Sequence, residues 1–297
     1  MGFRDFINRV FDTGESRDQG LGVDELARRL GLSEDALRNL EISYHQFGTS
    51  KRSGGTRIIS SPNRELKSIQ RRILHRVLKR VPVHPAAVGF ERGRSIVTNA
   101  LPHCGKAIVL KMDVKDFFGS TGAHRVRELF ERLGWNRKAA GLLTGLCTYE
   151  GALPQGAPTS PRLSNLVNAR MDARLAAVTR KLGAAYTRYA DDLTFSFAED
   201  RRRECNQMIR ISKLVLRDFG YQIHTRKKLQ VRRRHQQQIV TGLVVNAAVR
   251  LPRHTRRWLR AVEHRQATAR PGTLTPAQLE GWRSFQAMVS RQAGTGG

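Results

Sequence analysis

Apolar residues recur along the chain at two spacings, one typical of helices and the other of strands. Residues 66–80 place Leu, Ile and Val on one stripe of a predicted amphipathic helix. Residues 107–114 form a nearly continuous apolar run that ends in Asp113 and Val114. This pattern predicts a buried central strand. Residues 186–197 contain two apolar-rich runs around Ala190, Asp191 and Asp192, which predicts a hairpin with two carboxylates at its turn.

Further elements follow from the same spacings. Residues 23–30 and 33–40 predict two short helices joined by Gly31 and Leu32, which are either a helix-turn-helix or two helices packed on a larger domain. A Gly/Pro loop ends at Ser160, a predicted N-cap, and Pro161 then opens one long helix to about Leu182. We also predict a helix at 204–219, a basic turn at 232–235, a strand at 239–245, a basic helical region from Arg250 and a last helix capped at Thr275.

The net charge of the chain gives information about its binding partner. Its 297 residues carry 53 Lys and Arg against 25 Asp and Glu, a net charge of +28. Such an excess indicates a polyanionic partner, most simply nucleic acid. The absence of a long apolar run, lipidation motif or signal peptide argues against a membrane. The three cysteines, Cys104, Cys147 and Cys205, show no ligand spacing and predict free thiols in a cytoplasmic protein.

The acidic residues supply the candidate chemistry. Two adjacent acids at a turn are, by themselves, more often solvated than functional. Asp113, however, ends a buried strand, where an ionised carboxylate needs a partner. A hard cation shared by Asp113, Asp191 and Asp192 would meet that need.

Basic and glycine-containing segments indicate phosphate binding. Residues 51–62 bracket a Gly-Gly turn with cations and predict a basic hairpin that presents Lys51, Arg52 and Arg57. The cations on the surface of helix 66–80 favour phosphate contacts. The loop around Gln155 and Gly156 opens a helix, whose N-terminus can approach a nucleotide.

Taken in order, these segments resemble the fingers and palm of reverse transcriptases. The resemblance implies an α+β, right-hand polymerase fold, with fingers, a palm of antiparallel sheet backed by helices, and a short helical thumb. The implied boundaries are an N-terminal helical segment at 1–45, fingers at 46–105, palm at 106–245 with part of the fingers at about 120–155, and thumb at 246–297. The matching motifs are Met112-Asp113-Val114-Lys115-Asp116-Phe117-Phe118, Leu153-Pro154-Gln155-Gly156-Ala157-Pro158-Thr159-Ser160-Pro161 and Tyr189-Ala190-Asp191-Asp192.

Two shorter elements resemble retron reverse transcriptases in particular. They are Asn99-Ala100-Leu101-Pro102-His103 and Val240-Thr241-Gly242. The chain departs from the family at Gly119-Ser120-Thr121, where a Pro-Ser pair is usual, and at His224, where Asn is common. Neither departure changes an acid. Without the family, His103 is by default a hydrogen-bonded structural histidine.

The resemblance also implies roles for single residues. Asp113, Asp191 and Asp192 would hold two Mg²⁺ ions, for which Mn²⁺ is a possible substitute. Lys227 would protonate the leaving group. The incoming nucleotide would be bound by Lys51, Arg52, Arg57, Gln155 and Gly156, and Phe118 would exclude ribonucleotides, with packing as the competing role for its neighbour Phe117.

The partners implied by the family are a cognate structured noncoding RNA, used as template and primer, its DNA product and deoxynucleoside triphosphates. The product would be a branched DNA joined to a guanosine 2′-hydroxyl (msDNA), made in anti-phage defence with a separate effector protein. RNA would be bound by Asn99, His103, Val240, Thr241, Gly242, Arg253, Arg256, Arg257 and Arg260.

Three alternatives stay open at this point. One is another bacterial reverse transcriptase, from a group II intron, a diversity-generating element or a different defence system; the short region beyond Val245 argues against the intron enzyme. A second is a non-catalytic RNA-binding protein, against which all three acids argue. The third, RNA-templated RNA synthesis, is disfavoured by Phe118.

Overall fold

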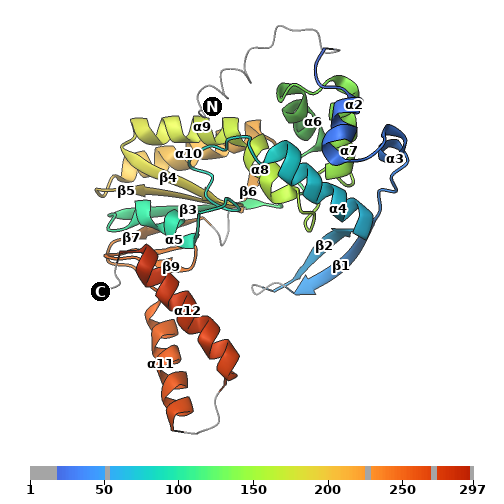
Figure 1. Ribbon diagram of the computed structural model, residues 1–297. Helices are drawn as coiled ribbons and strands as arrows, with labels where there is room; N and C mark the ends of the chain where they lie inside the picture. The colour runs from blue at the N-terminus through green and yellow to red at the C-terminus, as the bar shows by residue number, and fades with distance from the viewer. Residues whose placement is uncertain (1–18, 51–53, 225–228, 269–272, 295–297) are drawn as a thin grey trace. The chain divides into compact units, whose positions relative to one another are not determined.

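The computed structural model describes residues 19–50, 54–224, 229–268 and 273–294. The chain forms two compact units (Figure 1), and each is built from separate stretches of sequence. The first unit contains Met1–Ala87, Lys115–Ala173 and Leu216–Gln222; the second contains Val88–Val114, Arg174–Val215 and Ile223–Gly297. Mixed helices and antiparallel strands confirm the α+β class.

Helices and one hairpin make up most of the first unit. Their bounds are α2 Val23–Leu30, α3 Glu34–Arg38, β1 Tyr44–Ser50, β2 Thr56–Pro62, α4 Arg64–Ile73, α6 Ala123–Arg132, α7 Arg137–Cys147 and α8 Ser160–Val167. The predicted pair of short N-terminal helices is confirmed, and Leu26, Leu30 and Leu37 are buried in the core of this unit. The predicted basic hairpin is confirmed as β1 and β2, which pair antiparallel.

The helix predicted at 66–80 differs from the observed one in two ways. It starts at Arg64, because Asn63 caps it by accepting a hydrogen bond from the Leu66 N–H (2.8 Å). Beyond Ile73 it continues as a π-helix, Leu74–Leu78. Two of its cations bind protein: Arg72 donates to the Leu30 carbonyl and Arg76 to the Arg29 carbonyl, both at 2.8 Å. These two arginines cap the C-terminus of α2, and the phosphate contacts expected for the cations of this helix stay a prediction.

The single long helix predicted after Ser160 is instead two helices, α8 and α9 (Ala169–Lys181), separated at Asn168. The Asn168 side chain donates to the Ser164 carbonyl and the Tyr221 hydroxyl, both at 2.9 Å, and accepts from Arg125. Such side-chain bonds compete with helix continuation. The predicted cap is also displaced, because Thr159 occupies the N-cap and Ser160 donates its hydroxyl to the Pro154 carbonyl.

A five-stranded sheet forms the centre of the second unit. Its strands are β3 Ile108–Lys115, β4 Ala184–Tyr189, β5 Asp192–Phe197, β6 Gln222–Ile223 and β7 Gln230–Arg233. The order is β4-β5-β3-β6, and β7 also pairs with β3. The prediction of a buried central strand ending near Asp113 is therefore confirmed. Figure 1 shows α10 (Arg202–Asp218), a predicted helix, over one face of the sheet and α5 (Ile96–Ala100) on the opposite face.

Two predicted segments near the sheet are corrected. Arg232 and Arg233 belong to strand β7, so the basic turn begins only after them. The strand predicted at 239–245 is a small hairpin of β8 (Ile239–Val240) and β9 (Leu243–Val244). Its turn residues, Thr241 (φ 45°) and Gly242 (φ 83°), both have positive φ, as a two-residue hairpin turn of type I′ requires.

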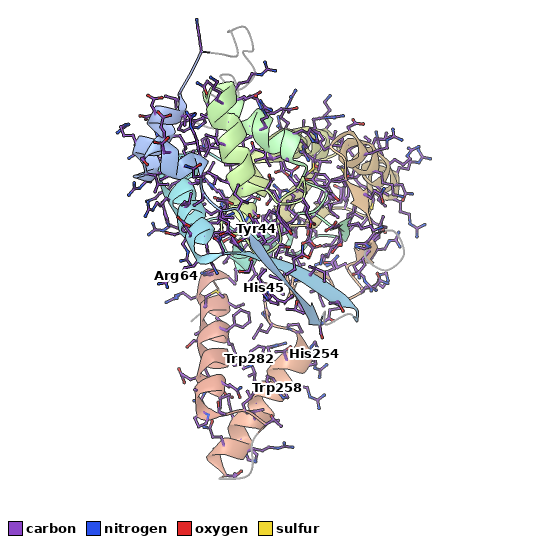
Figure 2. All side chains as sticks on the ribbon, turned by 90° about the vertical axis from the view of Figure 1, so that its right-hand side faces the viewer. Tyr44, His45, Arg64, His254, Trp258 and Trp282 are labelled. Atoms are coloured by element: carbon purple, nitrogen blue, oxygen red, sulfur yellow. The ribbon has the colours of Figure 1, made fainter. Side chains whose placement is uncertain are left out.

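The C-terminal helices pair as a helical hairpin. α11 (Arg253–Ala267) and α12 (Pro276–Gln292) contact each other. Trp258 and Trp282 (Figure 2) pack edge to face, with their ring centroids 5.4 Å apart. Thr275 caps α12 in a capping box, as predicted. The second unit's core joins these helices to α5 and the β8–β9 hairpin through Val97, Val240, Leu259, Leu279 and other apolar side chains.

Cys104, Cys147 and Cys205 are free thiols, as predicted. Burial raises the pKa of the Cys147 thiol to about 12, which makes this group unreactive at neutral pH. Within the described ranges, no helix combines the length and apolar character needed to span a bilayer.

Candidate active site

Three aspartates lie at one end of the central sheet. Asp113 on β3 lies directly opposite Asp192 on β5, and Asp192 lies opposite Tyr189 on β4. Directly opposed residues point to the same face, so Asp113 and Asp192 share one face with Tyr189 beside them; we call the two opposed acids the acidic row. Asp191 precedes Asp192 in the turn, and its carbonyl accepts a hydrogen bond from the Val114 N–H at 2.9 Å. The structure thus brings together the three acids that the sequence singled out.

The turn between β4 and β5 is held in a demanding conformation. Ala190 has a φ of 57°, a value that glycine usually supplies at the first position of such turns. The Arg188 guanidinium, on a fully buried side chain, donates to the Ala190 carbonyl at 3.1 Å. This bond and the one from Val114 to Asp191 fix both turn residues against the sheet.

A lysine and a histidine lie beside the acids. Lys111 Nζ lies 3.0 Å from an Asp192 carboxylate oxygen, and His224 Nε2 lies 3.7 Å from an Asp113 carboxylate oxygen. The His224 N–H also donates to the Asp113 carbonyl at 3.0 Å. The role of Lys111 was missed from the sequence, although the signal was present. A lone lysine two residues before Asp113 in an apolar strand must share its face.

The acidic row fits a hard divalent cation. Its donors are carboxylate oxygens, which such ions prefer, and Lys111 beside Asp192 shows that the site accommodates a positive charge. Among the described residues, no group of three or more His, Cys, Asp or Glu side chains is arranged to ligate a metal directly. Asp113, Asp191 and Asp192 could hold an ion only with a ligand set completed by water or substrate oxygens.

The predicted nucleotide-binding residues of the first unit lie on two segments in contact. Arg57 is exposed on β2, opposite Thr49. Further along the same strand, the Ser60 N–H donates to the Gln155 carbonyl at 2.8 Å. Gly156 has a φ of 135°, and a Cβ there would lie 2.7 Å from the Ser60 carbonyl oxygen. Only glycine fits this contact, so the hairpin and the Gln155 loop form one local structure. Lys51, Arg52 and Lys227 lie outside the described residues.

The two phenylalanines after Asp113 have different surroundings. Phe117 is only 4% exposed and stacks on Tyr221, with ring centroids 5.6 Å apart. This confirms packing as its role. Phe118 meets Phe117 edge to face and keeps part of its surface exposed, so it retains a ring that a ligand can contact.

His103 joins the two strands of the β4–β5 hairpin, which we call the catalytic hairpin. Its Nδ1 lies 2.7 Å from Ser196 Oγ on β5, and its Nε2 lies 2.8 Å from Thr187 Oγ1 on β4. Burial, with a smaller contribution from Lys106, lowers the pKa of its imidazole from 6.5 to about 3, so the ring is neutral. The expectation of a hydrogen-bonded structural histidine is confirmed. The side chains of Asn99, His103 and Val240 are fully buried and do not present a surface to RNA in this conformation.

The two short elements that resemble retron enzymes contact each other. The Thr241 hydroxyl donates to the Ile96 carbonyl at 3.0 Å, which ties the β8–β9 turn to the start of α5. Ser95 caps α5, and its hydroxyl also donates to Gln292 near the end of α12. We call α5 with the following Leu101–His103 turn the brace, because it connects the catalytic hairpin, the β8–β9 turn and α12.

Exposed arginines follow one helix of the C-terminal hairpin. Arg253, Arg256, Arg257 and Arg260 on α11 all reach solvent. Arg256 and Arg260 also line a groove between α11 and α12, where Arg283 pairs with Glu263 at 3.2 Å. A row of exposed guanidinium groups on a rigid helix suits the phosphates of a nucleic acid.

Comparison with known proteins gives a consistent result. A family profile described as "Reverse transcriptase (RNA-dependent DNA polymerase)" matches residues 49–258. Retron Mx65 reverse transcriptase of Myxococcus xanthus is 38% identical over 293 residues, covering 90% of this chain and 68% of that protein. Retron Mx162 reverse transcriptase of the same organism is 38% identical over 314 residues, covering 92% and 64%. Retron Ec86 reverse transcriptase of Escherichia coli is 32% identical over 292 residues, covering 92% and 88%.

Proposed function

Since this chain belongs to the reverse transcriptase family, and is thus an RNA-directed DNA polymerase, we propose that it is the polymerase of a retron. In this role it copies part of a cognate structured noncoding RNA into DNA. The observation that carries the proposal is the acidic row, in which Asp113 and Asp192 lie opposite each other and Asp191 lies in the adjoining turn. The names of the similar proteins and the presence of both retron-like elements support the narrower assignment.

The acids have the central role in the proposed chemistry. Reverse transcriptases use divalent metal ions, and we propose Mg²⁺ held by Asp113, Asp191 and Asp192, with Mn²⁺ as a substitute. Held there, such ions would supply the positive charge that activates an attacking hydroxyl and neutralises a departing pyrophosphate. The hydrogen bonds to the carbonyls of Ala190 and Asp191 keep the turn in place, so the carboxylates do not need to reorganise.

The first unit binds the incoming nucleotide in this proposal. Arg57, with Lys51 or Arg52, neutralises its triphosphate, because guanidinium and ammonium groups bind phosphate oxygens strongly. Gln155 and Gly156 position the nucleotide and the template base. Phe118 rejects a 2′-hydroxyl, which makes the product DNA. Lys227 protonates the leaving pyrophosphate.

The second unit selects the RNA. The exposed arginines of α11 contact its phosphates, and the exposed Gly242 turn contacts its stem by shape. Asn99 and His103 act from within the brace rather than by direct contact. We further propose the family's branched product, msDNA, started from a guanosine 2′-hydroxyl, and a cytoplasmic role in anti-phage defence with a separate effector protein.

The proposal is tested by the nucleic acid that co-purifies with the protein. Wild-type protein should carry RNA joined to DNA, sensitive in part to RNase and in part to DNase. A variant with Asp191→Ala and Asp192→Ala should carry the RNA without DNA and bind it within a few-fold of wild type. Asp200→Asn, at an exposed acid paired with Arg233, is the matched control and should leave the DNA in place. Bulk cellular RNA in the wild-type sample would contradict the retron assignment.

A further inference from the structure

The segment that precedes the brace is fixed against the catalytic hairpin. The Val88 N–H donates to the Arg188 carbonyl at 2.8 Å, and the Gly89 N–H approaches the same oxygen at 3.4 Å. A Cβ on Gly89 would lie 2.7 Å from the Ala190 nitrogen and 3.2 Å from the Tyr189 Cα. Glycine therefore allows this backbone to touch the residues that lead into the catalytic turn.

Phe90, the next residue, combines two unfavourable features. Its φ is 67°, a left-handed conformation that bulky side chains rarely adopt. Its ring is 45% exposed, although a phenylalanine gains most from burial. Its centroid lies 6.4 Å from that of Tyr189, with the ring planes tilted by 41°. A strained backbone that keeps an apolar ring in solvent is typical of ligand sites, because folding alone does not favour either feature.

The place of the two rings in the sheet indicates which ligand they meet. Tyr189 lies opposite Asp192, and Asp192 lies opposite Asp113, so the acidic row continues to Tyr189 on β4. Neighbouring residues in such a row are about 5 Å apart. Because Phe90 packs on Tyr189, its exposed ring extends the row beyond β4, which is an edge strand of this sheet.

From this geometry we propose that Phe90, supported by Tyr189, is a binding site for the sugar of the primer strand's last nucleotide. The inference rests on the proposed function. The nucleotide whose hydroxyl reacts must lie at the acidic row, whereas its base is covered on both faces by neighbouring bases. The apolar surface left for the protein is the sugar, which an aromatic ring contacts favourably. Phe90 is a substrate-positioning residue for the reaction.

A cross-linking experiment tests the contact directly. The photoreactive amino acid p-benzoylphenylalanine replaces Phe90 in the full chain, and the protein is bound to an RNA template with a labelled DNA primer. Irradiation should join the protein to the last nucleotide of the primer. The same replacement at Leu214, an apolar side chain of α10 that is 50% exposed, is the control and should give background yield. Cross-links only to the template strand or to a bound nucleoside triphosphate would overturn the proposal, as would background yield at Phe90.

Steady-state kinetics separate positioning from stability. Phe90→Ala should raise the KM for primer–template about tenfold, in the range of losing one aromatic contact to a nucleotide. The KM for deoxynucleoside triphosphate and the thermal midpoint should stay unchanged. Phe90→Tyr keeps the ring and should restore the primer KM, and Leu214→Ala should behave as wild type. If the wild-type enzyme extends primers and Phe90→Ala has the same primer–template KM as Leu214→Ala, this inference is refuted and the proposed function is not. A wild-type enzyme that extends no primer refutes the proposed function itself.

Discussion

Lys111 and Asp192 form the ion pair closest to the proposed chemistry, and it involves the same carboxylate that a metal ion needs. At the scale of single residues, we predict that Lys111→Met tightens divalent-ion binding several-fold. The reason is that the variant removes a positive charge which competes for Asp192. Tb³⁺ luminescence, displaced by Mg²⁺, measures the affinity without requiring activity.

The same variant should have a lower thermal midpoint in the absence of ions, because the acids then repel each other without compensation, and Mg²⁺ should restore it. Lys111→Arg keeps the charge and is the matched control. An unchanged or weaker ion affinity in Lys111→Met would contradict a competing role for the lysine.

His103 gives a prediction about pH. Its pKa is about 3 in the folded protein, against an ordinary value of 6.5 for the unfolded chain, so the unfolded chain binds the additional proton. The contribution of neutral His103 to the unfolding free energy is fully present above pH 6.5. As the pH falls from 6.5 toward 3, the unfolding free energy decreases by up to about 1.4 kcal/mol per pH unit. His103→Gln should show a shallower loss of unfolding free energy over this acidic range in urea titrations. The exposed His254→Gln is the control and should retain the wild-type slope.

At the scale of elements, the strands and hairpins that carry the site residues were more predictable from sequence than α8 and the brace, which pack around them. The central strand, the Asp191 hairpin and the basic hairpin follow from local patterns, because alternation and turn residues are encoded within a few positions. The end of α8 was not predictable, since it depends on Asn168 reaching Tyr221, a residue distant in sequence. Likewise, burial of Asn99 depends on the sheet against which the brace packs, so the RNA contact that the family resemblance implied for Asn99 could not be checked from the sequence.

The contact between the β8–β9 turn and the brace yields a second prediction at this scale. Thr241→Val removes the hydrogen bond to the Ile96 carbonyl and should lower the unfolding free energy by about 1 kcal/mol. Because the turn is then less well fixed, affinity for the cognate RNA should fall more than affinity for an unrelated hairpin RNA. Binding to both RNAs in parallel measures this difference. Thr241→Ser keeps the hydroxyl and should preserve both affinities; equal losses for the two RNAs would argue against selection by this turn.

At the scale of the whole molecule, the net charge of +28 governs how tightly RNA is held. Binding should weaken steeply with salt, because each phosphate contact releases counterions. Arg257→Ala and Arg260→Ala should each remove one phosphate contact. Each variant should therefore reduce the slope of log affinity against log salt by about 1. Arg28→Ala, at an exposed arginine paired with Glu25 in the first unit, is the control and should leave the slope unchanged. Identical slopes in all variants would show that α11 does not contact the RNA backbone.

The pairing of β3 with strands far later in the chain has a consequence for folding during synthesis. β3 comprises residues 108–115, but β5 follows at 192–197 and β7 only at 230–233. While the ribosome makes the intervening segments, β3 has polar backbone edges without their final partners, a state in which strands aggregate. The acidic row is thus assembled late in translation. The arginines of α11, proposed to contact RNA, lie at residues 253–260 and are made later still, so the strands that carry the acids precede the proposed RNA-binding helix during the synthesis of each molecule.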